Sequence, residues 1–237
     1  MDKILVDACN QIGVKINETQ VSQFMKYKDL LLSWNEKMNL TAITDDREVL
    51  LKHFADSVSL LPFIDLKGKN VIDVGTGAGF PGLPIKIACP EANLTLLDSL
   101  NKRINFLETV VSEIGLSNVT CIHSRAEDGG QNKDYREKFD VCVSRAVANL
   151  SVLSEYCLPF IKVGGCFVSL KGPDAKPEVI EAMKAIETLG GEIDIVEKVE
   201  IPFTDIVHTL VMIKKVRQTP NKYPRKSGKI SKNPIKW

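Results

Sequence analysis

A glycine-rich run constrains the fold of this chain more than any other part of its 237 residues. The run reads DVGTGAGFPG over 73–82, and it begins inside the apolar stretch Val71–Val74, which has the composition of a buried strand. The segment Pro84–Cys89 that follows has the pattern of a helix. Glycines between a strand and a helix allow a tight turn and let the backbone approach a ligand where a Cβ atom would clash. The run therefore predicts a strand, a turn and a helix, with a ligand site at the turn.

Short strands and helices alternate from about residue 66 onward. The predicted strands are Val71–Val74, Leu94–Asp98, Val119–His123, Phe139–Ser144 and Cys166–Leu170, and the predicted helices are Pro84–Cys89, Lys102–Ile114, Leu150–Phe160 and Pro177–Leu189. This alternation indicates a parallel sheet with helices on both faces. The last two strands, Glu192–Ile201 and His208–Val216, are separated by only six residues, so we expect an antiparallel hairpin. A mostly parallel sheet that ends in such a hairpin is typical of the Rossmann-like α/β fold of class I S-adenosylmethionine methyltransferases.

The chain divides into three regions by pattern and charge. Residues 1–65 have helical periodicity and should pack on the main domain, which we place at 66–216. Residues 214–237 contain nine basic and no acidic residues, whereas 1–213 contain 22 basic and 30 acidic ones. We therefore expect 217–237, which has three prolines, to be an extended basic tail. A tail of one sign of charge with interleaved Tyr223 and Trp237 favours contact with a nucleic acid, although it could also be a solubilising terminus.

Composition excludes several classes of protein. No apolar run approaches the roughly 18 residues that a membrane-spanning helix needs. The N-terminal residues lack the order of basic and apolar segments of a secretion signal, so we expect a cytoplasmic protein without a membrane partner. The six cysteines form no C-x-x-C pair and the three histidines are far apart in the sequence, which predicts reduced thiols and no metal site. Nothing in the sequence suggests an obligate dimer, so we expect a monomer.

Two further features favour a ligand that contains adenosine. Asp98 ends the second predicted strand, 19 residues after Gly79, where a carboxylate can accept hydrogen bonds from two ribose hydroxyls. Ala126 and Glu127 follow the third strand and could bind the edge of adenine. The spacing of three glycines also fits a dinucleotide fingerprint, so an NAD-dependent oxidoreductase is an alternative. The terminal hairpin and the absence of a Tyr-x-x-x-Lys pair favour S-adenosylmethionine.

The end of the fourth strand, where this fold places the methyl acceptor, reads Ser144-Arg145-Ala146. The Asn/Asp-Pro-Pro-aromatic motif of enzymes that methylate base amines is absent, and Cys142 lies inside the strand rather than at a nucleophile position. Guanine N7 is compatible with this site, because N7 carries a free lone pair and needs no general base. Other soft nucleophiles are equally compatible. We therefore predict no catalytic residue and a mechanism based on positioning.

The sequence resembles the small-subunit (16S) ribosomal RNA methyltransferase G family, also called glucose-inhibited division protein B. The resemblance rests on NLTAI at 39–43, HFADS at 53–57, DVGTGAGFPGLP at 73–84, DSLNKR at 98–103, RAE at 125–127, SRA at 144–146, LKG at 170–172 and YPRKSG at 223–228. The family often has proline where this chain has Ser227. The matches occur in order over nearly the whole chain.

The resemblance implies transfer of a methyl group from S-adenosylmethionine to N7 of one guanine in 16S rRNA, free or in the small ribosomal subunit. It implies cofactor contacts at Gly75, Phe80, Ala126, Glu127 and Arg145, to which spacing adds Gly77 and Asp98. We predict RNA contacts at Arg145, Lys171, His53, Tyr223, Arg225 and Lys226. Arg145 could instead be a salt-bridge partner, and His53 could simply bond Asp56. A non-catalytic rRNA-binding assembly factor is a second alternative.

Overall fold

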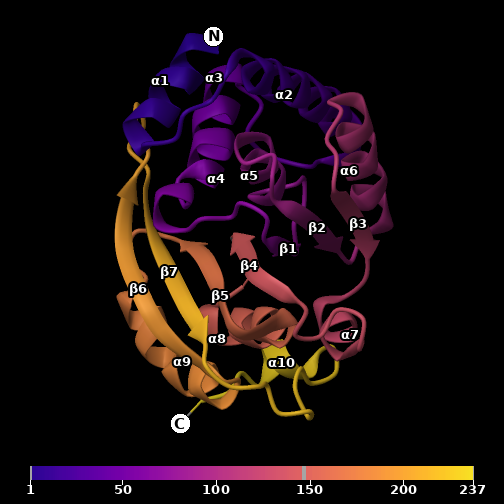
Figure 1. Ribbon diagram of the computed structural model, residues 1–237, viewed down its shortest axis with the longest axis vertical. Coiled ribbons are helices and arrows are strands. Elements are labelled where there is room, and N and C mark those ends of the chain that lie inside the picture. The colour runs from indigo at the N-terminus through magenta and orange to yellow at the C-terminus, as the bar shows by residue number, and fades with distance from the viewer. Residues whose placement is uncertain (1, 146–147, 237) are drawn as a thin grey trace.

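A seven-stranded mixed sheet forms the centre of the computed structural model, which describes residues 2–145 and 148–236 (Figure 1). Its strands are β1 (Asn70–Val74), β2 (Asn93–Asp98), β3 (Val119–His123), β4 (Phe139–Arg145), β5 (Ile161–Lys171), β6 (Gly191–Glu200) and β7 (Val207–Lys215). The spatial order is β3-β2-β1-β4-β5-β7-β6. Strands β1 to β5 are parallel, and β7 is antiparallel to both β5 and β6. The predicted fold, including its terminal hairpin, is confirmed.

The strand order reverses between β1 and β4, which are neighbours although two strands separate them in the chain. In open α/β sheets a ligand binds beyond the carboxyl ends of the strands at such a switch point. The glycine-rich run follows β1 and Arg145 ends β4, so both lie at this point.

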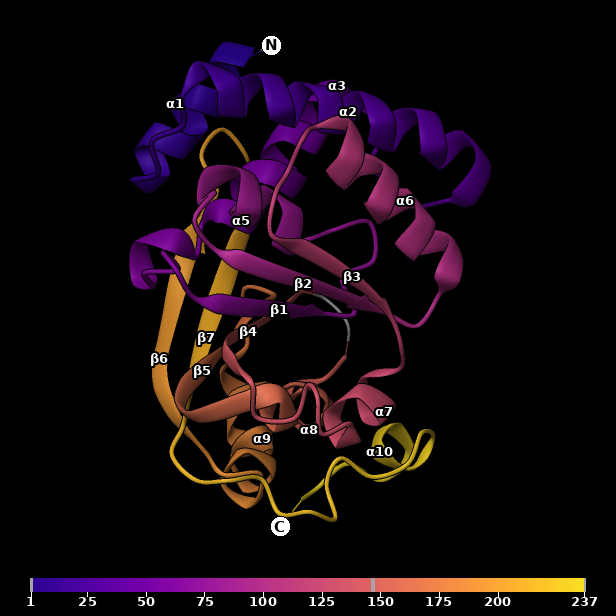
Figure 2. The same ribbon diagram turned by 45° about the vertical axis from the view of Figure 1, so that its right-hand side comes forward.

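Helices cover both faces of the sheet (Figure 2). The elements α1 (Asp2–Ile12), α2 (Glu18–Met38), α5 (Gly82–Ala88) and α6 (Asn101–Glu113) cover one face, and α7 (Ala126–Gln131), α8 (Leu150–Cys157) and α9 (Lys176–Thr188) cover the other. Side chains of β1 alternate between two cores, since Val71 belongs to the first cluster and Ile72 and Val74 to the second. This alternation explains why a continuous apolar stretch forms a strand covered on both sides.

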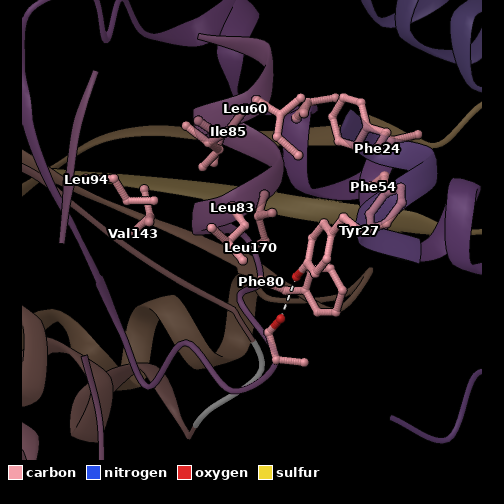
Figure 3. Packing of buried hydrophobic residues seen from close by; sticks show 14 of the residues in the cluster. Phe24, Tyr27, Phe54, Leu60, Phe80, Leu83, Ile85, Leu94, Val143 and Leu170 are labelled. Carbon is pink, nitrogen blue, oxygen red and sulfur yellow. Dashed lines mark hydrogen bonds between the residues drawn. The ribbon is translucent and has the colours of Figure 1, made fainter. Parts of the chain in front are cut away.

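The N-terminal helices share the first core with the sheet (Figure 3). Helix α2 begins with a capping box, in which the Asn17 side chain accepts from the Gln20 backbone N–H and the Gln20 side chain accepts from that of Asn17. Tyr27 stacks on Phe54 at a centroid distance of 5.1 Å, and its hydroxyl donates to the Ala78 carbonyl at 2.5 Å. Helix α2 therefore contacts the glycine-rich turn directly.

The segment after Asp45, in the region of helical periodicity, is not one regular α-helix. Asp45 caps α3 (Asp46–Glu48), which continues as the π-helix η1 (Val49–Ala55) and then as α4 (Asp56–Val58). π-helices are rare in proteins, but those that occur often lie at functional sites. Here η1 contains His53 and ends next to Asp56. The chain then passes through the 3-10 turn η2 (Leu61–Phe63) into β1.

The basic tail packs against the body over its described part, 217–236, where most residues are in no helix or strand. The tail lies along α7 and α8 and contains one helical turn, α10 (Lys229–Lys232) (Figure 2). Tyr223 and Ile230 are buried in it, and Arg225 pairs with the fully buried Glu155. These long-range contacts hold a segment whose local sequence predicts no regular structure. Trp237 lies outside the described residues.

Strand β6 forms one edge of the sheet (Figure 1). Its pairing with β7 shifts register between Ile193 and Ile195, which indicates a β-bulge. Among the described residues, no helix is both long and apolar enough to cross a membrane.

Candidate functional site

A cavity of about 410 Å³ opens at the switch point of the sheet, within the 300 to 1,000 Å³ or so typical of small-molecule sites. Its lining comprises Val74, Gly75, Leu97, Asp98, Ser99, Arg103, Ser124, Arg125, Ala126, Glu127, Arg145 and Tyr156. Five of the seven predicted cofactor residues are in this set: Gly75, Asp98, Ala126, Glu127 and Arg145. The other two, Gly77 and Phe80, do not line the cavity. They contact two residues that do, Asp98 and Arg145.

Gly77 acts through Asp98. Its backbone N–H donates to Asp98 Oδ2 at 2.9 Å, while the Leu100 N–H donates to Asp98 Oδ1 at 2.9 Å. Arg103 Nη1 also donates to Asp98 Oδ2, at 3.4 Å. Asp98 is only 2 % exposed, and a carboxylate has about four lone-pair positions, so roughly one remains for a ligand. Asp98 therefore fixes the shape of the glycine-rich turn and can still accept from a hydroxyl group in the cavity.

Two glycines of the turn are required by space and conformation. A Cβ atom on Gly79, whose φ is +102°, would lie 2.6 Å from both the Tyr27 hydroxyl and Leu83. A Cβ atom on Gly82 would lie 2.8 Å from Asp73 Oδ2. The turn is therefore packed against α2 and the end of β1. Of its other two glycines, Gly75 faces the cavity.

Asp73 is a member of the glycine-rich run whose role we did not predict. It is fully buried, and its Oδ2 accepts from Thr76 Oγ1 at 2.7 Å and from the Gly82 N–H at 2.8 Å. Its Oδ1 has no hydrogen-bond partner among the described residues. Burial raises the pKa of Asp73 from 3.8 to about 7, against the opposing effect of these hydrogen bonds. The carboxyl group thus holds the turn closed from beneath.

The opposite wall of the cavity comes from the start of α7 and from α8. Ala126 and Glu127 form the first turn of α7, where Glu127 is buried. Tyr156 on α8 is a lining residue that sequence reasoning missed, because helical periodicity does not distinguish a cavity-facing tyrosine from a packing one. Burial and the nearby Glu127 raise the pKa of Tyr156, so its hydroxyl is neutral and able to donate.

Arg145 is held on several sides at the end of β4. Its Nη1 donates to Asp56 Oδ2 at 2.5 Å and to the Lys52 carbonyl at 3.4 Å, and its Nη2 bonds His53 Nδ1 at 3.2 Å. Its guanidinium carbon lies 4.9 Å from the centroid of the Phe80 ring. Both readings of Arg145 therefore hold structurally: it is a salt-bridge partner and it lines the cavity. Of its five N–H donors, two have no contact in this set and remain for a ligand.

His53 belongs to the same cluster and is neutral. Burial, reinforced by Arg145, lowers its pKa to about 4. Arginine can only donate, so His53 Nδ1 accepts and the ring proton is on Nε2, which lies 2.7 Å from Thr41 Oγ1. The ring also stacks on Phe80 at 4.5 Å. His53 and Asp56 thus share Arg145 as a partner rather than pairing with each other, and both ring nitrogens of His53 are engaged.

The fully buried Asp56 carries the other end of this cluster. Its Oδ1 lies against His208 Nδ1 on β7, so one carboxylate contacts both β7 and Arg145 on β4. A buried carboxylate between a guanidinium and an imidazole fixes the orientation of both.

The remaining predicted RNA contacts differ in exposure. Lys171 is 10 % exposed in its side chain and bonds Glu178 and the Ala148 carbonyl. Tyr223 is buried and Arg225 is held by Glu155, so neither presents a free side chain. Lys226 is exposed and lines a groove between α7 and the tail. Ala146, the last residue of the SRA motif, lies outside the described residues.

The described residues contain no group of three or more His, Cys, Asp or Glu side chains that could hold a metal ion. The six cysteines are free thiols, and burial raises the pKa of Cys142 well above its usual value.

Comparisons with known proteins agree with this geometry. The family model described as rRNA small subunit methyltransferase G matches residues 20–207. A protein named Ribosomal RNA small subunit methyltransferase G from Alkaliphilus oremlandii is 56 % identical over 235 residues, covering 98 % of both chains. One of the same name from Acetivibrio thermocellus is 53 % identical over 233 residues, covering 98 % of this chain and 96 % of the relative.

Solved structures show the same fold at low sequence identity. A SAM-dependent O-methyltransferase from Thermotoga maritima is 18 % identical, with a TM-score of 0.52 over 80 % of this chain and 72 % of that one. The structure of M. jannaschii TYW2 in complex with AdoMet is 16 % identical, with a TM-score of 0.53 over 69 % of this chain and 76 % of that one.

Proposed function

The chain belongs to the rRNA small subunit methyltransferase G family, and from this premise we propose that it methylates N7 of one guanine in 16S rRNA. It is a methyltransferase that uses S-adenosylmethionine. The observation that carries the proposal is the cavity at the switch point, where an acidic ribose site, an adenine-edge site and a fixed arginine converge. Membership of this family excludes the alternative of an NAD-dependent oxidoreductase.

The residues of the cavity fit S-adenosylmethionine in volume and chemistry. Asp98 has acceptor capacity left for a ribose hydroxyl, and Glu127 is a buried carboxylate able to accept from an exocyclic amine. Gly75 brings backbone to the cavity without a Cβ atom. When bound, the cofactor supplies a methyl group on a positively charged sulfonium.

Positioning rather than proton transfer is the contribution of the protein. Guanine N7 presents a lone pair without deprotonation, so the reaction requires no general base. His53 is neutral and has both ring nitrogens engaged, which agrees with that requirement. Asp56 and His53 fix the guanidinium of Arg145, which keeps two N–H donors for a ligand. Alignment of the reactants can lower the barrier by roughly 7–11 kcal/mol.

RNA contact is proposed for the exposed lysines of the tail, with Lys226 in the groove beside α7. This groove shares Glu127 with the cavity, so an RNA bound along the tail would lie beside the cofactor site. Tyr223 and Arg225 support this surface by anchoring the tail. Lys171 and His53 would contact RNA only after a change of partner. Cytoplasmic location and a monomeric state remain predictions.

A methyl-transfer assay tests the proposal. The protein is incubated with labelled S-adenosylmethionine and either small ribosomal subunits or naked 16S rRNA from cells that lack this protein, and the RNA is digested to nucleosides. Label in N7-methylguanosine is the expected result, and the better substrate identifies when the enzyme acts. Label in another nucleoside would refute the guanine N7 assignment. Cofactor binding without transfer to either RNA would favour the non-catalytic assembly factor.

A further inference from the structure

A second groove, of about 300 Å³, lies between the start of η1 and the loop that joins β6 to β7. We call it the Phe203 groove; its lining comprises Arg47, Glu48, Leu51, Lys52, Phe203, Thr204, Asp205 and Ile206. The loop stands beside the N-terminal helices in two views of the molecule (Figures 1 and 2). The methyl-transfer site described above uses none of the loop residues.

Phe203 is held at the surface by its backbone. Its φ of +64° is a left-handed conformation that a bulky side chain rarely adopts, and the residue is 46 % exposed. The loop around it is well bonded, since the Ile201 N–H donates to the Ile206 carbonyl and the Thr204 hydroxyl donates to the Ile201 carbonyl. An exposed aromatic ring in a strained but fixed turn gains little from burial, which points to a role in binding.

The polar groups around the ring complement a nucleotide. Arg47 is exposed and has no ion-pair partner among the described residues, so its guanidinium remains for a phosphate. Lys52 and Glu48 neutralise each other at 2.6 Å. Asp205 is exposed, and its carboxylate can accept from a base amino or imino group. Bases that are unstacked in RNA loops are bound by aromatic stacking together with hydrogen bonds to their edges.

The groove is continuous with the Arg145 cluster. Lys52 is a lining residue of the groove, and its carbonyl accepts from Arg145 Nη1. On the other side, β7 begins directly after the loop and carries His208, which contacts Asp56. The sheet register also places the start of β7 beside the carboxyl end of β5, because Thr209 pairs with Lys171. The groove and the cavity therefore lie on the same edge of the sheet.

We propose that the Phe203 groove binds an unstacked nucleotide of the RNA substrate close to the methylated guanine, with its base on Phe203 and its phosphate at Arg47. This inference rests on the proposed function, because it assumes that an RNA substrate binds beside Arg145, at the carboxyl ends of the parallel strands. The groove would hold the RNA strand in register on the acceptor side, while the tail contacts it on the side of the cofactor.

The test compares the parent protein with Phe203→Gly, Phe203→Trp and Arg47→Gln. Glycine removes the ring and tolerates the positive φ, so the variant should fold; tryptophan restores a stacking surface. Phe63→Ala is a matched control, since Phe63 is a 36 % exposed phenylalanine in η2, before the amino end of β1, and does not line the Phe203 groove. The dissociation constant for small ribosomal subunits and for naked 16S rRNA is measured by filter binding, and that for S-adenosylmethionine by calorimetry.

We expect Phe203→Gly to weaken RNA binding about 5- to 150-fold, the range for one lost base–aromatic stack, with unchanged cofactor affinity. Phe203→Trp should restore RNA affinity, Arg47→Gln should weaken it and reduce its salt dependence, and Phe63→Ala should leave it unchanged. Equal RNA affinity of the parent and Phe203→Gly would overturn the inference, as would equal losses in Phe203→Gly and Phe63→Ala. Failure of the proposed function differs, because the parent itself would then methylate neither RNA.

Discussion

The pair of Glu155 and Arg225 allows a quantitative test of whether the tail is part of the fold. Arg225 Nε and Nη2 bond the two carboxylate oxygens at 2.6 to 3.2 Å, and the Arg225 backbone N–H adds a contact at 2.8 Å. The side chain of Glu155 is 0 % exposed, whereas that of Arg225 is 27 % exposed. The perturbations are Arg225→Met, Glu155→Gln and the double variant.

The two single variants should differ in magnitude because their partners differ in burial. Arg225→Met leaves the Glu155 carboxylate buried without its counter-charge, and loss of one partner of a buried pair costs about 3–5 kcal/mol. Glu155→Gln leaves Arg225 able to turn toward water, so we expect the smaller loss of a charged hydrogen bond, about 1.5–3 kcal/mol. The double variant should be less destabilised than the sum of the two.

Urea unfolding followed by circular dichroism gives the free energy of unfolding of each variant, and limited trypsin digestion reports whether the tail lysines become accessible. A coupling energy of about 0.5–3 kcal/mol is expected for residues in direct contact. If the two effects simply add, or if Glu155→Gln is the more damaging change, the tail is not docked through this pair. Trypsin cleavage in the tail at the same rate in parent and variants would lead to the same conclusion.

Three other predictions concern the cofactor cavity, the glycine-rich turn and the tail. Asp98→Ala should weaken S-adenosylmethionine binding by about 1–3 kcal/mol in calorimetry, and unchanged affinity would remove Asp98 from the site. Burial raises the pKa of Asp73 from 3.8 in the unfolded chain to about 7 in the folded protein. Protonation of Asp73 therefore stabilises the folded state fully below pH 3.8, and this stabilisation is lost as the pH rises through 7. In urea unfolding without cofactor, Asp73→Asn should abolish this decline of the free energy of unfolding with pH. Parallel profiles of unfolding free energy against pH for the two proteins would contradict the prediction. Replacing the exposed tail lysines by glutamine should lower the salt dependence of RNA binding by about 0.7 per lost phosphate contact, and an unchanged slope would show that the tail does not contact RNA. These lysines are Lys222, Lys226, Lys229, Lys232 and Lys236.

Local pattern predicted most of the sheet. The strand Val119–His123 has the predicted bounds, and the helical periodicity of residues 1–65 corresponds to real helices such as α2. These features depend on neighbouring residues, which the sequence displays directly. The π-helix η1 was not predicted, because its apolar residues have nearly the same spacing as those of an α-helix.

Long-range contacts explain what sequence reasoning missed at the site. Glu155 lies 70 residues before Arg225, and nothing in either neighbourhood indicates that the two meet. The RNA role predicted for Arg225 followed from charge alone, whereas the structure gives that charge a buried partner. Asp98 and Glu127 were found because their distance from a strand end fixes their position at the switch point.

The antiparallel hairpin that completes the sheet makes β6 a ten-residue edge strand. The backbone N–H and C=O groups on its outer side could pair with another strand. The bulge between Ile193 and Ile195 bends this edge strand. The strand also carries four carboxylates, those of Glu192, Asp194, Glu197 and Glu200. Lys198 is the one basic residue of β6, so charged side chains of both signs, mostly acidic, occupy this edge, which disfavours pairing with another strand. A bulge and charged side chains are features by which edge strands avoid edge-to-edge aggregation, and β6 has both.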